Sequence, residues 1–491
     1  MTVTSEKTTP FPPGFIKART PILLTLGLMY AAYYTGRYNF LSVANKTLTT
    51  EFGWRADEWG LIINATLWAY AAGQLINGVR VDRIGGRRMM LIGAIGIVAV
   101  NVLFGFGMFI RTLSYFVGMG ILLGFFQAHG APSLVKICAN WLRMNERGTF
   151  TGIFGLIIQC GRWAILLGGG WLVANAPWQW LFWAPAAVIA AAAVLFYFVV
   201  KDNPEDLGLP PAETDDVGHG VEDTTPLRVG EIVRKVATNK VIWILAGAYF
   251  CTGVIRWGVD SWYIRYLQET YNMRTDSFTY VISAFLIPAS AVAGSFVAGL
   301  LSDKVFGARR GPAAALMYFM SFAMLLLFLN FPGPILSVVF LVILQMFING
   351  PHSLLGGAAA MDFGGRKAAG FATGLIDACQ NLGGGLFAGS IIGNVIQSYG
   401  NIPGTTNISA AGWQAWIFVL MGFTILGGVL MTTLWNARPR GRSPLPPQLP
   451  RHSLQLRRYQ LRVKGFLRHI LKHRVRNLES FHFNIIGILR L

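Results

Sequence analysis

The chain has 491 residues, of which 54% are hydrophobic and only 13% are charged, and its mean hydropathy is +0.50. Soluble domains are about one quarter charged, so this composition excludes an ordinary soluble protein and indicates an integral membrane protein. The formal charge of +19 is concentrated near the C-terminus, where residues 437–491 hold 13 Lys or Arg and one acid. The charge therefore gives no argument for nucleic-acid binding by the rest of the chain.

Apolar stretches that can cross a bilayer recur along the whole chain. We expect twelve transmembrane helices, at 20–44, 57–79, 89–110, 113–138, 149–173, 178–200, 241–266, 279–301, 312–330, 335–357, 368–397 and 412–435. They fall into six and six around a polar stretch that is rich in acids, proline and glycine, which is typical of a soluble linker. The expected fold is therefore all-α and membrane-integral, with two six-helix halves.

These helices divide the chain into five parts. They are an N-terminal cytoplasmic segment (1–19), the N-terminal half (20–200), a cytoplasmic linker (201–240), the C-terminal half (241–435) and a basic C-terminal tail (436–491). The loops after the expected helices 2, 4, 8 and 10 carry most of the loop Lys and Arg. Because basic loops stay in the cytoplasm, we expect a multi-pass protein of the cell (inner) membrane with both termini cytoplasmic.

The two halves are copies of one unit. GVRVDRIGGRR (78–88) and GLLSDKVFGARR (299–310) share the pattern Gly-x-x-x-Asp-Arg/Lys, followed by a glycine and paired arginines. HGAP (129–132) and NGP (349–351) are separated along the chain by almost the same offset as these two loops. Halves of this kind around a site at the midplane are a transporter architecture.

The duplicated loop carries Asp82 and Arg83 in the first half and Asp303 and Lys304 in the second. The aspartates can accept hydrogen bonds from a neighbouring helix end while the basic residues stay on the wet side. Two interpretations stay open. The loops either hold a cytoplasmic gate or act only as a topology signal.

Two arginines occupy equivalent positions inside the membrane. The offset between Arg37 and Arg256 matches that of the duplicated loops to within two positions, and Tyr30 and Tyr34 share a helix face with Arg37. A charge at the centre of a membrane helix costs about 2.5–3.5 kcal/mol, so it usually faces a cavity or a partner. Two guanidinium groups on symmetric helices match the oxygens of a dianion such as a phosphate.

Three further charges lie at similar depth. Asp260 follows Arg256 by four residues, so a local ion pair between the two is an alternative to the anion site. Arg162 and Asp377 are candidates to pair with each other, to line the cavity, or to do both. Asp377 is also a candidate protonation site. We assign Asp260, Arg162 and Asp377 to gating or coupling.

The residues around these charges resemble the organophosphate:phosphate antiporters of the major facilitator superfamily. The resemblance rests on YYTGRYNFLSVANK (33–46), IRWGVDSWYIRYLQE (255–269), FQAHGAP (126–132) and RKAAGFATG (366–374), and it covers about 20–435. It implies the fold of that superfamily, anion exchange, and phosphate binding by Arg37 and Arg256.

The chain departs from the glycerol-phosphate members of that family around the arginines. Gln74 stands where those members have a lysine, Gln159 and Arg162 lie in the region of a histidine, and Asn381 replaces a tyrosine. The organic part of the substrate is therefore left open. We expect Tyr30, Tyr34, Gln74 and Trp257 to shape the cavity.

The function that we expect is secondary active transport of an organic phosphate or similar dianion, in exchange for inorganic phosphate, by a monomer in the lipid bilayer. A proton-coupled symporter of carboxylates and a membrane sensor of phosphorylated sugars are alternatives. No nucleophile–base set, metal cluster or nucleotide motif occurs, so we expect neither an enzyme nor a metal or other cofactor. The basic stretch 456–478 can form an amphipathic helix on anionic lipid, or it has no role.

Overall fold

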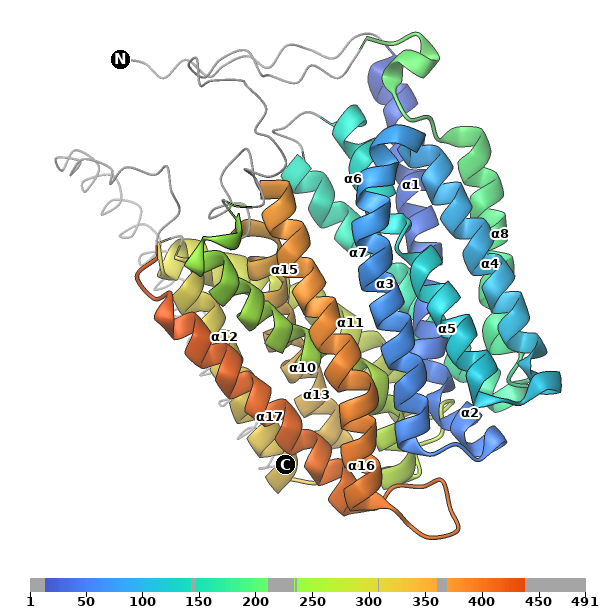
Figure 1. Ribbon diagram of the computed structural model, residues 1–491, viewed down its shortest axis with the longest axis vertical. Helices are drawn as coiled ribbons and strands as arrows, with labels where there is room; N and C mark the ends of the chain where they lie inside the picture. The colour runs from blue at the N-terminus through green and yellow to red at the C-terminus, as the bar shows by residue number, and fades with distance from the viewer. Residues whose placement is uncertain are drawn as a thin grey trace, which may run out of the picture. The chain divides into compact units, whose positions relative to one another are not determined.

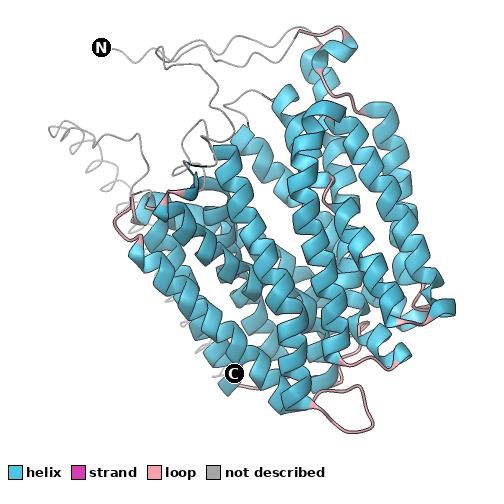
Figure 2. Cartoon of the chain, viewed as in Figure 1, coloured by secondary structure: helices cyan, strands magenta, loops and turns pink. Residues whose placement is uncertain are grey.

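The computed structural model describes residues 14–142, 147–210, 234, 236–307, 309–359 and 369–437. Within these residues the chain is helical apart from its loops and one isolated β-bridge between Asn401 and Ile408 (Figure 2). The C-terminal tail from residue 438 onward, including the expected amphipathic helix at 456–478, lies outside the described residues.

The described part of the N-terminal half contains nine segments. They are α1 (Phe15–Tyr38), the π-helix η1 (Asn39–Val43), α2 (Ala44–Phe52), α3 (Ala56–Ile84), α4 (Gly86–Ile110), α5 (Leu113–Gln127), α6 (Gly130–Trp141), α7 (Arg147–Asn175) and α8 (Trp180–Val199). A short 3₁₀ turn, η2 (Pro204–Leu207), follows α8 at the start of the linker.

The C-terminal half, over its described residues, contains ten segments. They are α10 (Lys240–Tyr271), α11 (Phe278–Leu300), η3 (Leu301–Val305), α12 (Arg310–Asn330), α13 (Pro334–Ser353), η4 (Leu354–Ala359), α15 (Ala369–Gly383), η5 (Gly384–Ile391), α16 (Ile392–Gly400) and α17 (Ala410–Thr433). Each of the twelve expected spans corresponds to one helix or to a run of consecutive segments, and nine of the described spans are long and apolar enough to cross a membrane.

Local chemistry explains where several segments begin and end. The expected span 113–138 is divided at Ala128 and His129, because Pro132 has no N–H to donate to the carbonyl four residues earlier. Gly85 has a φ of +91°, which lets the chain turn directly from α3 into α4. The side chain of Asn239 accepts from the Val241 N–H at 3.0 Å and begins α10.

The two halves pack against each other along α3 and the α15–η5–α16 run, which cross side by side in Figure 1. Their backbones come very close at Gly60 and Gly389, where a Cβ on either glycine would overlap the carbonyl of the other. Only glycine permits this distance, so the interface depends on both positions.

The two ends of the bundle carry different segments of the chain. The linker end carries residues 201–210 after α8, and the distal end carries α2 and the loop 401–409 (Figure 1). In the described residues, η1, α2 and the loop 401–409 form hydrogen bonds between the halves toward the distal end. The halves are therefore joined at the distal end.

Candidate anion site

Arg37 lies in the last turn of α1 and is almost fully buried. Its Nε and Nη2 both donate to Oε1 of Gln127, at 3.3 Å each. The guanidinium group also lies 4.5 Å from the ring centre of Tyr70 and 5.1 Å from that of Tyr34. An amide oxygen and two aromatic faces hold this cation, and no ion pair joins it to an acid of the described chain.

Arg256 has a different environment at the equivalent position of α10. Its Nε is buried without a hydrogen-bond partner, and the guanidinium group lies 5.2 Å from the ring centre of the neighbouring Trp257. No hydrogen bond or ion pair joins Arg256 to any residue that the structure describes. The residue as a whole is half-buried, and a cation in this state is available to an anion from outside the chain.

Arg256 lines a cavity of about 390 Å³ between the two halves. The walls come from α1, α7, α11 and α13, and they include Tyr34, Tyr38 and Gln159. The lining continues to Gly155, Phe296 and Ser353, near the linker-side ends of their helices. The cavity therefore runs from the middle of the bundle toward the linker end, and its volume suits a small organic ligand.

The two arginines share aromatic neighbours. Tyr34 packs against Tyr38 with ring centres 5.7 Å apart, and Tyr38 packs against Trp257 at 6.3 Å. Tyr34, Tyr38 and Trp257 thus connect the surroundings of Arg37 with those of Arg256, and of the four residues assigned to the cavity Tyr34 is the one that lines it. The other two residues assigned to the cavity lie nearby: Tyr30 packs on Tyr34 at 5.6 Å, and Gln74 donates to the Tyr70 hydroxyl at 2.9 Å.

Asp260 pairs with Arg162 of α7, and the sequence did not anticipate this partner. Arg162 Nη2 lies 2.5 Å from Asp260 Oδ1, and both side chains are buried. The same oxygen accepts from Gln345 Nε2 at 2.6 Å, and the Tyr38 hydroxyl is 3.4 Å from Oδ2. The ion pair connects the two halves. Asp260 therefore does not pair with Arg256, and Arg162 does not pair with Asp377.

Asp377 on α15 does not pair with Arg162. It lies within electrostatic range of both Arg37 and Arg256 and faces the Gln74 side chain. The carboxylate forms no ion pair with the described residues. A substrate anion between the two arginines would therefore have this carboxylate as a neighbour.

The residues of the duplicated loops lie at the linker end of the bundle, away from the charged residues inside the membrane. Asp303 accepts a hydrogen bond from Arg310 at 2.8 Å, so it pairs with the start of α12 in its own half. Lys304 and Arg83 are exposed to solvent, and the side chain of Asp82 lies outside the described residues. The structure places these residues at the cavity's end of the bundle and records no contact of Asp303 across the described parts of the halves.

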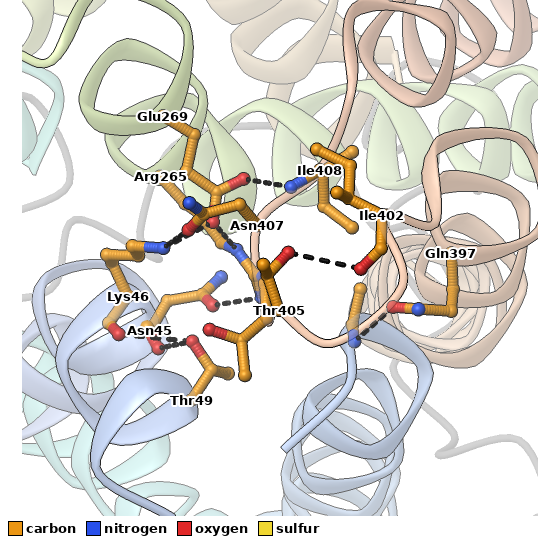
Figure 3. Close-up of polar contacts among 12 residues, drawn as sticks. Asn45, Lys46, Thr49, Arg265, Glu269, Gln397, Ile402, Thr405, Asn407 and Ile408 are labelled. Carbon is orange, nitrogen blue, oxygen red and sulfur yellow. Dashed lines mark hydrogen bonds and ion pairs between the residues drawn. The ribbon is translucent and has the colours of Figure 1, made fainter. Parts of the chain in front are cut away.

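A polar cluster joins the halves at the distal end. We call Asn45, Lys46, Arg265, Glu269 and Asn407 the distal cluster. Glu269 accepts from Lys46 at 2.8 Å and from Arg265 at 2.9 Å, and Arg265 donates to the carbonyl oxygen of Thr406 at 2.6 Å (Figure 3). Lys46 also contacts Asn407, so α2, α10 and the loop 401–409 are tied together.

Sequence reasoning missed the neutral polar residues of the site. Gln127 and Tyr70 hold Arg37, Gln345 holds Asp260, and His352 lines the cavity beside Arg256. A search of the expected spans for every buried amide and imidazole would have found three of them, because such groups inside a membrane helix need partners.

Comparison with known proteins identifies the family of the chain. Residues 26–388 match the family described as the Major Facilitator Superfamily. The chain belongs to the Major Facilitator Superfamily. Membership places it among multi-pass membrane transport proteins and not among enzymes.

Curated relatives of this superfamily member support the narrower resemblance. It is 28% identical over 439 residues to the glycerol-3-phosphate transporter of Bacillus subtilis, covering 87% of this chain and 94% of that protein. It is 26% identical to a probable hexose phosphate transport protein of Chlamydia pneumoniae, covering 85% and 91%. It is also 29% identical to the membrane sensor protein UhpC of Salmonella typhimurium, covering 75% and 83%.

Solved structures share the fold. A bacterial homologue of the human lysosomal transporter Spinster, in an inward-facing and unoccupied conformation, superposes with a TM-score of 0.67 at 14% identity, covering 85% of this chain and 95% of that one. The nucleoside transporter NupG gives a TM-score of 0.62 at 12% identity, covering 85% and 100%. The two-half architecture expected from the internal repeat is confirmed as the fold of this superfamily.

Proposed function

We propose that this protein transports an organic phosphate across the membrane in exchange for inorganic phosphate. The observation that carries the proposal is Arg256, a half-buried cation with no partner in the described chain, which lines a cavity of about 390 Å³. Arginine binds phosphate oxygens with two parallel hydrogen bonds and keeps its proton, so this site favours a phosphoryl group. The names of the relatives support the same substrate class.

Arg37 supplies the second half of the anion site. It must turn from Gln127 Oε1, an uncharged acceptor, to reach a phosphoryl group. Exchange of that amide for a phosphoryl group is favourable, because an anion adds a charge–charge attraction and offers two oxygens for two parallel hydrogen bonds. Tyr34 and Trp257 lie beside the two arginines and shape the space that the phosphoryl group enters.

Transport follows from closing the linker end and opening the distal end around the bound anion. The halves are held by the distal cluster at the distal end and by the Arg162–Asp260 ion pair nearer the middle of the bundle. We propose that the linker end faces the cytoplasm of the cell, with both termini on that side, and that the distal cluster forms the outer gate. Alternating exposure of one central site is the general mechanism of such two-half transporters.

The protein acts as a monomer, because one chain supplies both arginines and the cavity. Asp82 and Arg83 in one half, and Asp303 and Lys304 in the other, hold the linker end when the cavity closes. Asp377 acts as the coupling group, since an anion bound by the arginines changes its electrostatic surroundings.

Counterflow in proteoliposomes tests the proposal. Vesicles that contain the purified protein and are loaded with inorganic phosphate take up labelled phosphate, and external organic phosphates compete with it, without a pH gradient. Arg274→Lys is a matched control, because Arg274 is an exposed loop arginine with its own partner, Asp276.

The outcomes separate the alternatives. Uptake that requires a proton gradient and a carboxylate would replace the proposal with symport. Saturable phosphate binding without any exchange would favour a sensor, a role suggested by the relative named as a membrane sensor.

A further inference from the structure

The C-terminal half presents an imidazole to the same cavity. His352 lies on α13 and lines the cavity together with Arg256. We infer that His352 recognises the organic part of the substrate by donating a hydrogen bond from Nε2 to one of its hydroxyl groups. The inference rests on the proposed function and adds a residue that determines specificity.

The partners of His352 determine which ring nitrogen carries the proton. Nδ1 lies 2.8 Å from Nε2 of Gln380 and 2.7 Å from the Tyr249 hydroxyl. An amide nitrogen can only donate, so Nδ1 accepts from Gln380 and carries no proton, and the Tyr249 hydroxyl lies against the same atom. The proton of the neutral ring therefore lies on Nε2.

The same contacts fix the position of the ring. The planes of His352 and Tyr249 differ by only 8°, so the two rings lie nearly parallel, with the Tyr249 hydroxyl 2.7 Å from Nδ1. Nε2 is then the one polar atom of the ring without a described partner. Since the residue lines the cavity, this N–H is the donor that a ligand can reach.

Acceptors line the same cavity as this donor. Asn349 lies one turn before His352, and its amide nitrogen donates to Gln345, which leaves Oδ1 as an acceptor. Ser353 donates to the carbonyl oxygen of Gly350 and keeps its lone pairs. On the wall from the other half, Oε1 of Gln159 is buried without a hydrogen-bond partner in the described chain.

This combination matches a hydroxyl group, which donates and accepts in one place. A second carboxylate or phosphoryl group would need another cation, and among the described residues that line this cavity Arg256 is the only permanent one. An alkyl chain would leave the Gln159 oxygen and the His352 N–H without partners. The favoured ligand therefore has one anionic group and an uncharged part that carries hydroxyl groups.

The test compares phosphate exchange with recognition of the organic part. Phosphate-loaded proteoliposomes are assayed with labelled phosphate and with three competitors: glycerol 3-phosphate, glucose 6-phosphate and propyl phosphate, which has no hydroxyl group. His352→Phe keeps an aromatic ring and removes both nitrogens. We expect KM for the better hydroxylated probe to rise about three- to tenfold, with propyl phosphate and phosphate self-exchange unchanged within twofold.

Two further variants separate recognition from folding. His352→Gln carries an N–H donor at a similar distance from the backbone, and we expect it to restore part of the discrimination. Gln380→Met frees the ring to adopt the other tautomer and raises the same KM by a smaller factor.

Three results would overturn the inference. The first is an unchanged ratio between hydroxylated and hydroxyl-free probes in His352→Phe. The second is an equal loss of phosphate self-exchange that His352→Gln does not restore. The third is a wild-type protein that exchanges phosphate but prefers propyl phosphate. If the wild-type protein exchanges no phosphate at all, the proposed function fails instead.

Discussion

The Arg162 guanidinium lies 2.5 Å from the Asp260 carboxylate, and this ion pair joins α7 of one half to α10 of the other. Both side chains are buried, so neither charge has water as an alternative partner. Removing one partner of a buried pair costs about 3–5 kcal/mol, whereas a neutral replacement of both costs much less. The pair therefore stabilises the arrangement in which the distal end is closed.

We expect Arg162→Gln and Asp260→Asn each to lower the melting temperature of the purified protein. The double variant should recover most of that loss, because it leaves no buried charge unpaired. Thermal unfolding in detergent, followed by tryptophan fluorescence, measures the three variants against the wild-type protein. Additive losses in the double variant would contradict an energetic coupling between these residues.

The anion site predicts that Arg256→Lys abolishes exchange while the protein still reaches the membrane. Lysine keeps the charge but cannot form two parallel hydrogen bonds to a phosphoryl group, so kcat/KM should fall at least about 100-fold. Uptake by proteoliposomes, normalised to the amount of inserted protein, gives the measurement. Normal exchange by this variant would rule out the two-arginine site.

The distal cluster predicts that Glu269→Gln weakens closure of the distal end. Glu269 is the carboxylate of the cluster that accepts from both Lys46 and Arg265, and Arg265 is fully buried. Loss of that charge leaves Arg265 without an anion, so we expect the outward-open population to rise. Ser42 lies on η1 and donates to the carbonyl oxygen of Asp260 between the halves, so Ser42→Cys, in a background without native cysteines, should react faster with an external maleimide. An unchanged reaction rate would show that the cluster does not hold the gate.

The close approach of Gly60 and Gly389 predicts that added bulk at either glycine hinders the movement of the two halves. A methyl group at Gly389 overlaps the Gly60 carbonyl, so Gly389→Ala should separate α3 from η5 and slow exchange by about tenfold or more. Gly422→Ala is the matched control, because no atom lies within 4 Å of the position of its Cβ. Equal rates in the two variants would contradict tight contact between the halves at this point.

The assigned orientation predicts which loops can be labelled from outside the cell. Thr405 lies in the loop 401–409 at the distal end, and Glu205 lies at the linker end. A cysteine at position 405 should react with a membrane-impermeant maleimide in intact cells. One at position 205 should react only after the membrane is permeabilised. The opposite pattern would reverse the topology given by the basic loops.

The sequence predicts the fold well because the signals of a membrane protein are local and repeated. Twelve apolar segments and one nearly constant offset, seen in the duplicated loops and again between Arg37 and Arg256, are sufficient to predict two similar halves. Segment boundaries depend on single residues instead. Pro132 divides one expected span, and η1 and α2 continue another to Phe52 at the distal end.

The partners of the charged residues were harder to predict, because they depend on which helices meet. Asp260 is four residues after Arg256, but the order of base before acid is the weaker one along a helix. Three groups from other helices reach Asp260 instead: Arg162, Gln345 and Tyr38. Chain spacing within α10 contains no information about those contacts.

The repeat also hides a difference between the two arginines. Gln127 and Gln345 occupy nearly equivalent positions in the two halves, yet Gln127 holds Arg37 while Gln345 holds Asp260. Arg37 is thereby held by the Gln127 amide, whereas Arg256 has no amide partner in the described chain.

This difference has a kinetic consequence. An anion that enters the cavity meets Arg256 without displacing a partner from the described chain, so Arg256 should control how fast the ligand is captured. Arg37 must exchange Gln127 for the ligand and must accept the amide again before the ligand leaves. Gln127 thus competes with the cargo for one side of the site. Its strength as an acceptor sets the residence time, so the turnover of the carrier depends on a residue that carries no charge.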